Sequence, residues 1–138
     1  MNIMSVPKSM RPSRGLSDDP LWYKDAVIYE ARTRSFYDSN GDGIGDFQGL
    51  KSKLDYLADL GITAIWILPH YPSPGRDDGY DIADYTSVHA DVGTIEDFDQ
   101  LVRCVLLLGL SITADLRCAP WDRWEADSVF TIVYGERQ

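Results

Sequence analysis

The loop at residues 38–46 contains the side chains with the clearest capacity for chemistry. It reads Asp-Ser-Asn-Gly-Asp-Gly-Ile-Gly-Asp, so oxygen-bearing side chains alternate with residues that let the backbone turn tightly. Such a loop can wrap several oxygen atoms around one hard cation, and an oxygen-only ligand set with several carboxylates suits Ca²⁺. The predicted ligands are the side chains of Asp38, Asn40, Asp42 and Asp46 and the backbone carbonyl of Ile44.

A metal-free turn is the competing interpretation of the same loop. The segment begins like an EF-hand loop, but Gly49 occupies the twelfth position, where that motif has a bidentate glutamate. The residues before the loop also favour a strand, whereas an EF-hand has a helix there. Asn and Gly could form a tight turn without any ion. We favour the calcium site because oxygen side chains recur at alternate positions.

A second acidic segment, residues 77–85, follows the second predicted strand. Carboxylates can accept hydrogen bonds from the hydroxyl groups of a sugar, and an aromatic face can pack against its C–H groups. Asp77 and Tyr80 lie three residues apart and could serve one pyranose ring in both ways. By chemistry alone, a solvated acidic loop is the simpler interpretation, since charged side chains are mostly exposed.

The remaining candidate residues argue against other kinds of site. His70 and His89 have no cysteine, second close histidine or acid at metal-binding spacing, so we expect polar loop roles and no zinc. The alternating glycines of residues 41–45 lie in an acidic loop, which would repel a nucleotide phosphate. Cys104 and Cys118 are too few for a disulfide scaffold, and we predict that both are reduced.

The composition indicates a globular protein and excludes several partners. The 138 residues include 44% apolar and 25% charged side chains, which suits one packed domain. With 13 basic and 22 acidic residues the net charge is −9, which argues against nucleic acid, because phosphate binding needs a basic surface. No apolar run approaches the length of a membrane span, and residues 1–20 contain no apolar segment typical of secretion signals. We therefore expect a cytoplasmic protein without a membrane partner.

The hydrophobic periodicity predicts alternating strands and helices. In chain order, the predicted elements are a strand at residues 26–29, a helix at 47–60, a strand at 62–68, a helix at 94–108 and a strand at 110–116. Residues 129–134 are β-prone but have no evident place in this order. Alternation of this kind is typical of a parallel sheet, and the long loop at residues 70–93 has the length of a functional loop. The predicted fold class is α/β: about three β/α units, an incomplete N-terminal portion of a TIM (β/α)8 barrel of about 250 residues.

Several longer motifs occur in a fixed order between residues 21 and 98. They are WYKDAVIY at 22–29, RSFYDSNGDGIGDF at 34–47, LDYL at 54–57, WILP at 66–69, and YPSP at 71–74 followed by DGYDIADY at 78–85. Together these motifs resemble the α-amylase superfamily, glycoside hydrolase family thirteen. Within it, the pairing of the calcium-type loop with Pro-Ser-Pro and residues 76–81 is most similar to the trehalose synthases, and the oligo-1,6-glucosidases are close relatives.

The resemblance implies part of a TIM-barrel catalytic domain that acts on α-glucosides by a retaining mechanism. Such a mechanism uses a nucleophilic carboxylate and a carboxylic acid about 5 Å apart. Matched by motif, Asp77 and Tyr80 correspond to residues that hold glucose in the reacting subsite. The five predicted ligands in residues 38–46 correspond to the family's calcium loop, so structural Ca²⁺ is the expected cofactor. An α-linked glucose disaccharide such as maltose or trehalose is the expected ligand, and Asp81, Asp84 and Tyr85 are expected to support the loop.

The resemblance fails towards the end of the chain. In the family's next motif an aspartate is followed by an Asn-His pair, and Asp115 matches that aspartate. Ala119 and Pro120 stand where the Asn and His are expected. Beyond Pro120 we find no further resemblance and no match to the nucleophile or the acid. We therefore expect an N-terminal fragment of such an enzyme, not catalytic on its own.

The resulting domain prediction has three parts: a disordered leader at residues 1–20, a partial barrel at 21–116 and a diverged tail at 117–138. A partial barrel leaves a sheet edge and barrel-facing side chains uncovered, so we expect self-association through the exposed sheet. Three alternatives stay open. The chain could be a non-catalytic calcium- or sugar-binding module, a fragment of an oligo-1,6-glucosidase or α-amylase-type hydrolase, or the remnant of a disrupted gene.

Overall fold

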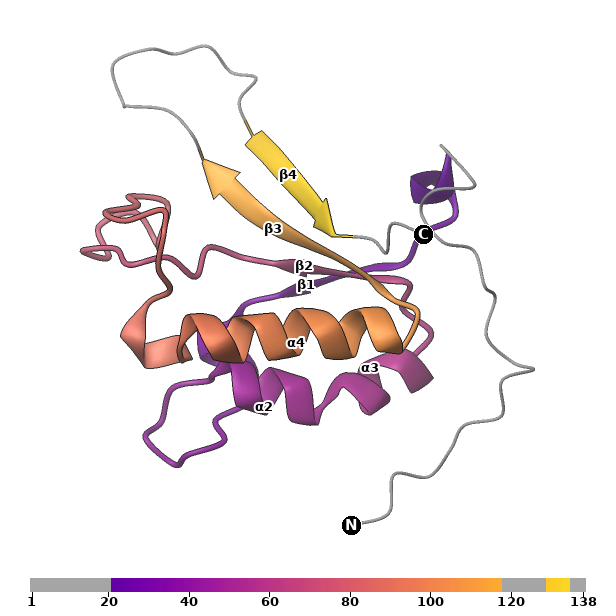
Figure 1. The fold of residues 1–138 in the computed structure, drawn as a ribbon, viewed down its shortest axis with the longest axis horizontal. Helices are drawn as coiled ribbons and strands as arrows, with labels where there is room; N and C mark the ends of the chain where they lie inside the picture. The colour runs from indigo at the N-terminus through magenta and orange to yellow at the C-terminus, as the bar shows by residue number, and fades with distance from the viewer. Residues whose placement is uncertain (1–20, 118–128, 135–138) are drawn as a thin grey trace.

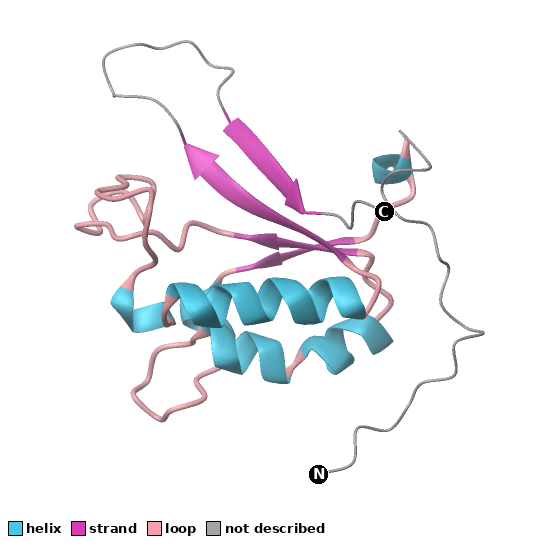
Figure 2. Cartoon of the chain, in the orientation of Figure 1, coloured by secondary structure: helices cyan, strands magenta, loops and turns pink. Residues whose placement is uncertain are grey.

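Three parallel strands form the centre of the structure, a computed structural model that describes residues 21–117 and 129–134. Strand β1 (Ile28–Ala31) pairs with β2 (Ala64–Ile67), and β2 pairs with β3 (Ser111–Arg117), both in parallel. Helices lie between consecutive strands along the chain and cover one face of the sheet (Figures 1 and 2). The predicted α/β class and the parallel sheet of a partial barrel are confirmed.

A fourth strand, β4 (Val129–Tyr134), lies beside β3 and runs antiparallel to it. The pairing extends from Arg117 opposite Val129 to Ile112 opposite Tyr134, and the order of the sheet is β1-β2-β3-β4. The β-propensity of these residues was visible in the sequence, but their partner was not. Since a (β/α)8 barrel is built from parallel strands, β4 departs from the barrel pattern.

The helices follow the predicted periodicity with one interruption. They are α1 (Thr33–Phe36), α2 (Phe47–Ser52), α3 (Leu54–Asp59) and α4 (Ile95–Leu107), with 3-10 turns η2 (Trp22–Lys24) and η3 (Ala90–Val92). The helix predicted over 47–60 is two helices, because the backbone of Lys53 has φ −108° and ψ 7° and leaves the α conformation. Helix α4 begins directly after Thr94, where its start was predicted, at a capping box between Thr94 and Asp97, and Gly109 follows it with φ +73°.

The core lies between the helices and one face of the sheet. Side chains alternate along the strands, so Ile65, Ile67 and Ile112 point to the helices and are fully buried. They pack in one cluster with helix residues that include Leu50 and Leu101. The opposite face is covered less completely, since Ile28 is 47% exposed there.

Some predictions concern residues that the structure does not describe. The leader at residues 1–20, together with Cys118, Ala119 and Pro120, lies outside the described residues. Cys104 is a free cysteine, and the prediction that both cysteines are reduced stays a prediction. No helix in residues 21–117 or 129–134 has the length and apolar character needed to cross a membrane.

Candidate functional site

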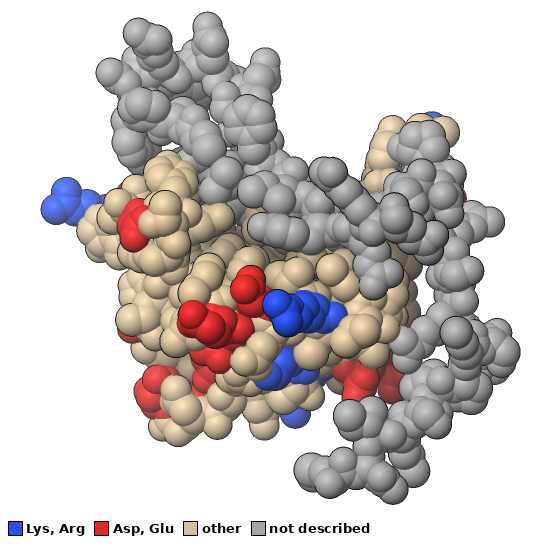
Figure 3. All heavy atoms as spheres, viewed as in Figure 1, with Lys and Arg blue, Asp and Glu red and all other residues tan. Residues whose placement is uncertain are grey.

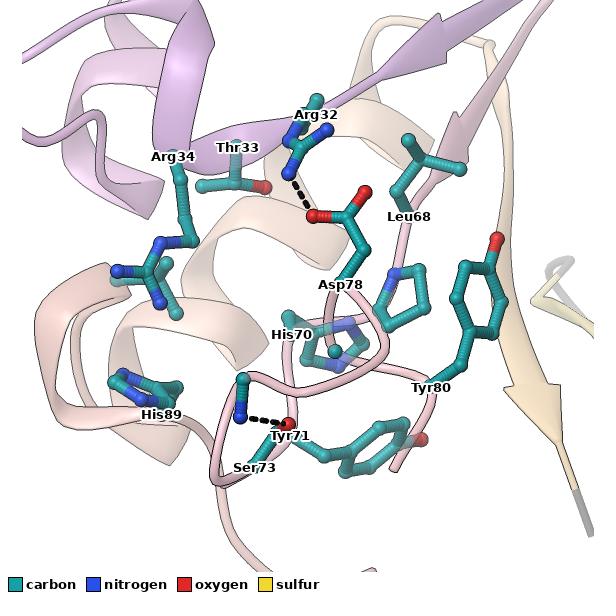
Figure 4. A pocket seen from close by; sticks show the side chains of 14 residues that line it. Arg32, Thr33, Arg34, Leu68, His70, Tyr71, Ser73, Asp78, Tyr80 and His89 are labelled. Atoms are coloured by element: carbon teal, nitrogen blue, oxygen red, sulfur yellow. Dashed lines mark hydrogen bonds and ion pairs between the residues drawn. The ribbon is translucent and has the colours of Figure 1, made fainter. Parts of the chain in front are cut away.

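A cavity of about 290 Å³ opens beyond the carboxyl ends of β1 and β2. Its lining comes from the residues after β1, from the loop after β2 and from η3, including Arg32, Thr33, Arg34, His70, Tyr71, Ser73, Asp78, Tyr80 and His89 (Figure 4). In open and closed α/β folds, ligands bind at the carboxyl ends of the parallel strands, since the loops that can vary gather there. The volume is near the lower end of the range for small-molecule sites.

The two predicted sugar-binding residues lie at the ends of one tight turn. The Tyr80 amide donates a hydrogen bond of 2.8 Å to the Asp77 carbonyl, and both side chains are half-buried. Within the described part of the chain, Tyr80 belongs to the lining of the cavity and Asp77 does not. The central residues, Asp78 and Gly79, have φ +54° and +97°, the left-handed pair typical of a type I′ turn. The turn therefore holds the backbones of Asp77 and Tyr80 next to each other.

Two aspartates hold this loop in shape from within. The carboxylate of Asp81 accepts hydrogen bonds from the Ser73 hydroxyl and, at 2.8 Å, from the Arg76 amide. The carboxylate of Asp84 accepts three, two of them from hydroxyl groups, and these hold the pKa of Asp84 at about 2. The prediction that Asp81 and Asp84 support the loop is confirmed.

Two ion pairs flank the cavity. Arg32, the residue after β1, pairs with Asp78 at the corner of the turn, and Figure 4 shows the two side chains pointing toward each other. Arg34 pairs with Asp91 of η3 at 2.8 Å. None of these four residues stood out as a candidate in the sequence. Each pair joins segments more than 40 residues apart, and no local pattern reports such a contact.

His70 is buried among aromatic rings, so the predicted polar loop role is wrong. It is 4% exposed, and its ring stacks on Tyr71 at 4.5 Å and on Phe98 at 4.7 Å between centroids. Burial lowers the pKa of His70 to about 4, although hydrogen bonding with the Leu68 backbone opposes part of the change. The His70 Nδ1 has no hydrogen-bond partner among the described residues, so the imidazole acts mainly as an aromatic core side chain.

The loop at residues 38–46 is organised by hydrogen bonds from its own backbone. The carboxylate of Asp38 accepts from the amides of Asn40, Gly41 and Gly43, and the amides of Gly43 and Gly41 contribute most to lowering its pKa. The side chains of Asn40 and Asp42 each accept from the amide two residues ahead. Because Asp38 stays ionised over a wide pH range, the loop presents a formal negative charge around the exposed turn.

Asp46, the last predicted side-chain ligand, is 6% exposed and caps α2. Its carboxylate accepts from the Gly49 amide at 2.6 Å and from the hydroxyl of Ser39 at 2.8 Å. The chain packs tightly here, because a Cβ added at Gly49 would lie 2.0 Å from the Tyr37 carbonyl oxygen. This region therefore links the loop rigidly to α2.

The geometry of residues 38–46 bears on metal binding in two ways. Every predicted ligand, including the half-buried Ile44, would contribute oxygen, and Asp38 Oδ2 and Asp42 Oδ1 each accept one hydrogen bond and keep a lone pair for a cation. Both carboxylate oxygens of Asp46 already accept two hydrogen bonds, from Ser39 and Gly49. Across residues 21–117 and 129–134, however, no three His, Cys, Asp or Glu side chains gather as a metal cluster would require. Figure 3 shows acidic side chains grouped over the loop that leads into α2 and over the start of α4.

Comparison with known proteins identifies the family to which these elements belong. The model of the α-amylase catalytic domain matches residues 28–119, which include β1, β2, β3 and the whole cavity. The chain belongs to the α-amylase family. The parallel sheet with its helices is thus the partial TIM barrel of an α-amylase catalytic domain.

The relatives of this α-amylase family chain include proteins named as a trehalose synthase and as an α-glucosidase. Trehalose synthase from Thermus thermophilus is 59% identical over 80 residues, 58% of this chain and 8% of that protein. A glucan 1,6-alpha-glucosidase from Streptococcus pneumoniae is 55% identical over 95 residues, 69% of this chain and 18% of that protein. The chain therefore spans less than a fifth of these relatives.

Solved structures support the same assignment. Trehalulose synthase MutB from Pseudomonas mesoacidophila MX-45 matches with a TM-score of 0.67 and 56% identity over 69% of this chain and 17% of that one. A mutant of MutB with the same match is described in complex with the substrate sucrose. The predicted resemblance to the α-amylase superfamily, with trehalose synthase among its most similar members, is confirmed.

Proposed function

We propose that this chain supplies the glucose-binding corner of a retaining enzyme that acts on α-glucosides, and that the reaction is the interconversion of maltose and trehalose. The observation that carries the proposal is the turn that places Asp77 and Tyr80 together at the carboxyl ends of β1 and β2, beside the cavity. The 59% identity to trehalose synthase supports the choice of reaction.

The two side chains have complementary capacities toward a pyranose ring. The Asp77 carboxylate can accept hydrogen bonds from sugar hydroxyl groups, and such charge-assisted bonds are stronger than neutral ones. The Tyr80 ring can pack against the apolar C–H face of the same sugar, with its hydroxyl group as a polar handle. Glucose held at this corner would present its anomeric carbon to groups supplied by other strands of a barrel.

The covalent chemistry is assigned to no residue of this chain. A retaining mechanism needs a nucleophile and an acid about 5 Å apart, and an enzyme that isomerises a disaccharide must keep water from the glucosyl intermediate. The residues proposed here bind and orient the sugar. We therefore expect the isolated chain to bind sugar without converting it.

An oligo-1,6-glucosidase is the second candidate. The glucan 1,6-alpha-glucosidase of Streptococcus pneumoniae, which is named for the same linkage, matches over 95 residues, whereas the trehalose synthase matches over 80. Such an enzyme hydrolyses the glucosyl intermediate, and its substrate is an α-1,6-linked glucoside. The two proposals differ in the linkage that the chain should prefer.

We further propose that residues 38–46 bind a structural Ca²⁺. Asp38, Asn40, Asp42 and the Ile44 carbonyl would supply ligands from the loop, while Asp46, on giving up its hydrogen bond from the Ser39 hydroxyl, would join the ion to the start of α2. The all-oxygen donor set supports this choice of cation, which would neutralise part of the loop's negative charge.

Sugar binding can be tested by NMR titration of the ¹⁵N-labelled 138-residue chain. With maltose, trehalose or isomaltose, we expect shifts of the amide signals of residues 77–80 and loss of binding in Asp77→Asn and Tyr80→Ala. Tyr56→Ala is the matched control, since Tyr56 is 62% exposed on α3. An absence of binding to all three sugars would reject the proposal, and a preference for isomaltose would favour the glucosidase. Conversion of maltose by the chain alone would contradict the assignment of a binding role only.

A further inference from the structure

The shape of the Asp77–Tyr80 turn depends on an uncommon backbone conformation. Asp78 is the only non-glycine residue with positive φ within residues 21–117 and 129–134. For an ordinary L-residue the left-handed conformation is unfavourable, and Asp tolerates it better than most residues. Asp78 is also exposed, so burial of its side chain does not hold it in place.

One side of the turn is held by packing. A Cβ added at Gly79 would lie 3.2 Å from the Pro69 Cβ, so the backbone of Gly79 lies against the residue that follows β2 by two positions. This contact fixes Gly79 only. The backbone hydrogen bond from Tyr80 to Asp77 closes the turn, and a restraint on the Asp78 side chain would hold its corner as well.

That restraint is available from Arg32. Its guanidinium Nη2 donates to the Asp78 carboxylate, and Arg32 is the residue directly after β1. The neighbouring residues Ala31 and Thr33 are 0% and 4% exposed, so the backbone that carries Arg32 is firmly held. An ion pair from this position ties the corner of the turn to the parallel sheet.

We propose that Arg32 is a positioning residue for the sugar-binding turn. By pairing with Asp78, it keeps the corner left-handed and thereby keeps Asp77 and Tyr80 at the spacing that one glucose ring requires. The proposal rests on the proposed function for the sugar itself, whereas the effect of Arg32 on the turn does not depend on it. Arg32 acts through Asp78 and is not assigned a contact with sugar.

Arg34 provides the matched control. It lines the same cavity and forms an ion pair of similar exposure, with side chains 44% and 36% exposed compared with 50% and 59% for Arg32 and Asp78. Its partner Asp91 lies in η3 and not in the turn. Arg32→Met and Arg34→Met thus remove the same charge from one cavity, and only Arg32→Met releases the turn.

The first measurement is hydrogen exchange of the Tyr80 amide, which donates across the turn to Asp77. Exposed ion pairs contribute about 0.2–1 kcal/mol, so we expect this amide to exchange up to about fivefold faster in Arg32→Met. We expect no change in Arg34→Met and partial recovery in Arg32→Lys. Asp78→Asn keeps a residue that tolerates the left-handed conformation, and its combination with Arg32→Met should exchange no faster than either single variant. Unchanged Tyr80 exchange in Arg32→Met, or the same change in Arg34→Met, would overturn the proposal.

The second measurement is the dissociation constant for maltose in the same variants. We expect Arg32→Met to weaken binding by the same factor of up to about five, while Arg34→Met does not. If the unaltered chain binds no sugar, the proposed function fails, and the exchange rates alone decide the role of Arg32. If Arg32→Met does not fold, the unaltered chain in about 1 M salt, where the Debye length is about 3 Å, should show the faster Tyr80 exchange. A rate independent of salt would then refute the proposal.

Discussion

Burial of His70 makes the stability of this protein depend on pH in a defined window. The ring is 4% exposed between Tyr71 and Phe98, and its pKa falls from 6.5 to about 4. In the folded state the imidazole is therefore neutral down to about pH 4, whereas in the unfolded chain it takes up a proton below about pH 6.5. The contribution of the buried neutral ring to the free energy of unfolding is therefore complete above pH 6.5, and it is lost as the pH falls from 6.5 to about 4.

The size of this effect follows from the two pKa values. A tenfold difference in proton affinity corresponds to about 1.4 kcal/mol, so the change from 6.5 to about 4 corresponds to roughly 3 kcal/mol of unfolding free energy. Asp84, with a pKa of about 2 in place of 3.8, loses its contribution only below about pH 4. The two effects therefore fall in separate pH ranges.

Urea unfolding of the chain between pH 7 and pH 4 measures the effect. His70→Phe keeps an aromatic ring and removes the unpartnered Nδ1, so we expect it to abolish roughly 3 kcal/mol of the pH dependence. At pH 7 its stability should lie within about 1 kcal/mol of the unaltered chain. The chain contains two histidines, and His89→Gln is the control that should keep the pH dependence. Equal pH dependence of His70→Phe and the unaltered chain, or an imidazole of native His70 that titrates near pH 6.5 by NMR, would refute the reasoning.

Three further predictions concern the loop, its packing and the sheet. Ca²⁺ should raise the melting temperature, and at a free concentration 100 times the dissociation constant it should add about 2.7 kcal/mol to the free energy of unfolding. Asp38→Asn should remove most of this gain, and an equal gain from Mg²⁺ would argue against the site. Gly49→Ala should destabilise the chain by about 2 kcal/mol or more in urea, since the new Cβ would lie 2.0 Å from the Tyr37 carbonyl oxygen; an unchanged midpoint would contradict that packing. In sedimentation experiments the chain should associate as its concentration rises. Ile28 is 47% exposed on β1, so Ile28→Lys should reduce this association. A chain that stays monomeric at every concentration would rule out association through the exposed sheet.

The elements that sequence analysis located correctly depend on local signals. The start of α4 was predictable because Thr94 and Asp97 form a cap within one turn, and its end because Gly109 can adopt positive φ. The interruption at Lys53 was not predictable, since lysine favours helix and nothing nearby in the sequence marks a break. The antiparallel partner of residues 129–134 was likewise hidden, because strand pairing depends on segments distant in the chain.

In the candidate site, too, residues with local signals were predictable and residues with distant partners were not. Asp77 and Tyr80 were found through a motif, and their turn is local, with Gly79 supplying the second left-handed residue. Arg32 was missed because its partner is 46 residues away. His70 was assigned a polar role because it begins a long loop, whereas helix residues that pack beside it in three dimensions, such as Phe98, bury it.

The direction of β4 limits how this sheet can grow. In a closed barrel, the free side of β3 accepts a strand that runs the same way, but here β4 already occupies that side in the opposite sense. The two arrangements are mutually exclusive, because one strand edge offers a single set of hydrogen-bonding groups. For the sheet to close into a barrel, residues 129–134 would first have to separate from β3. The antiparallel pairing of β4 with β3 therefore competes with completion of the barrel.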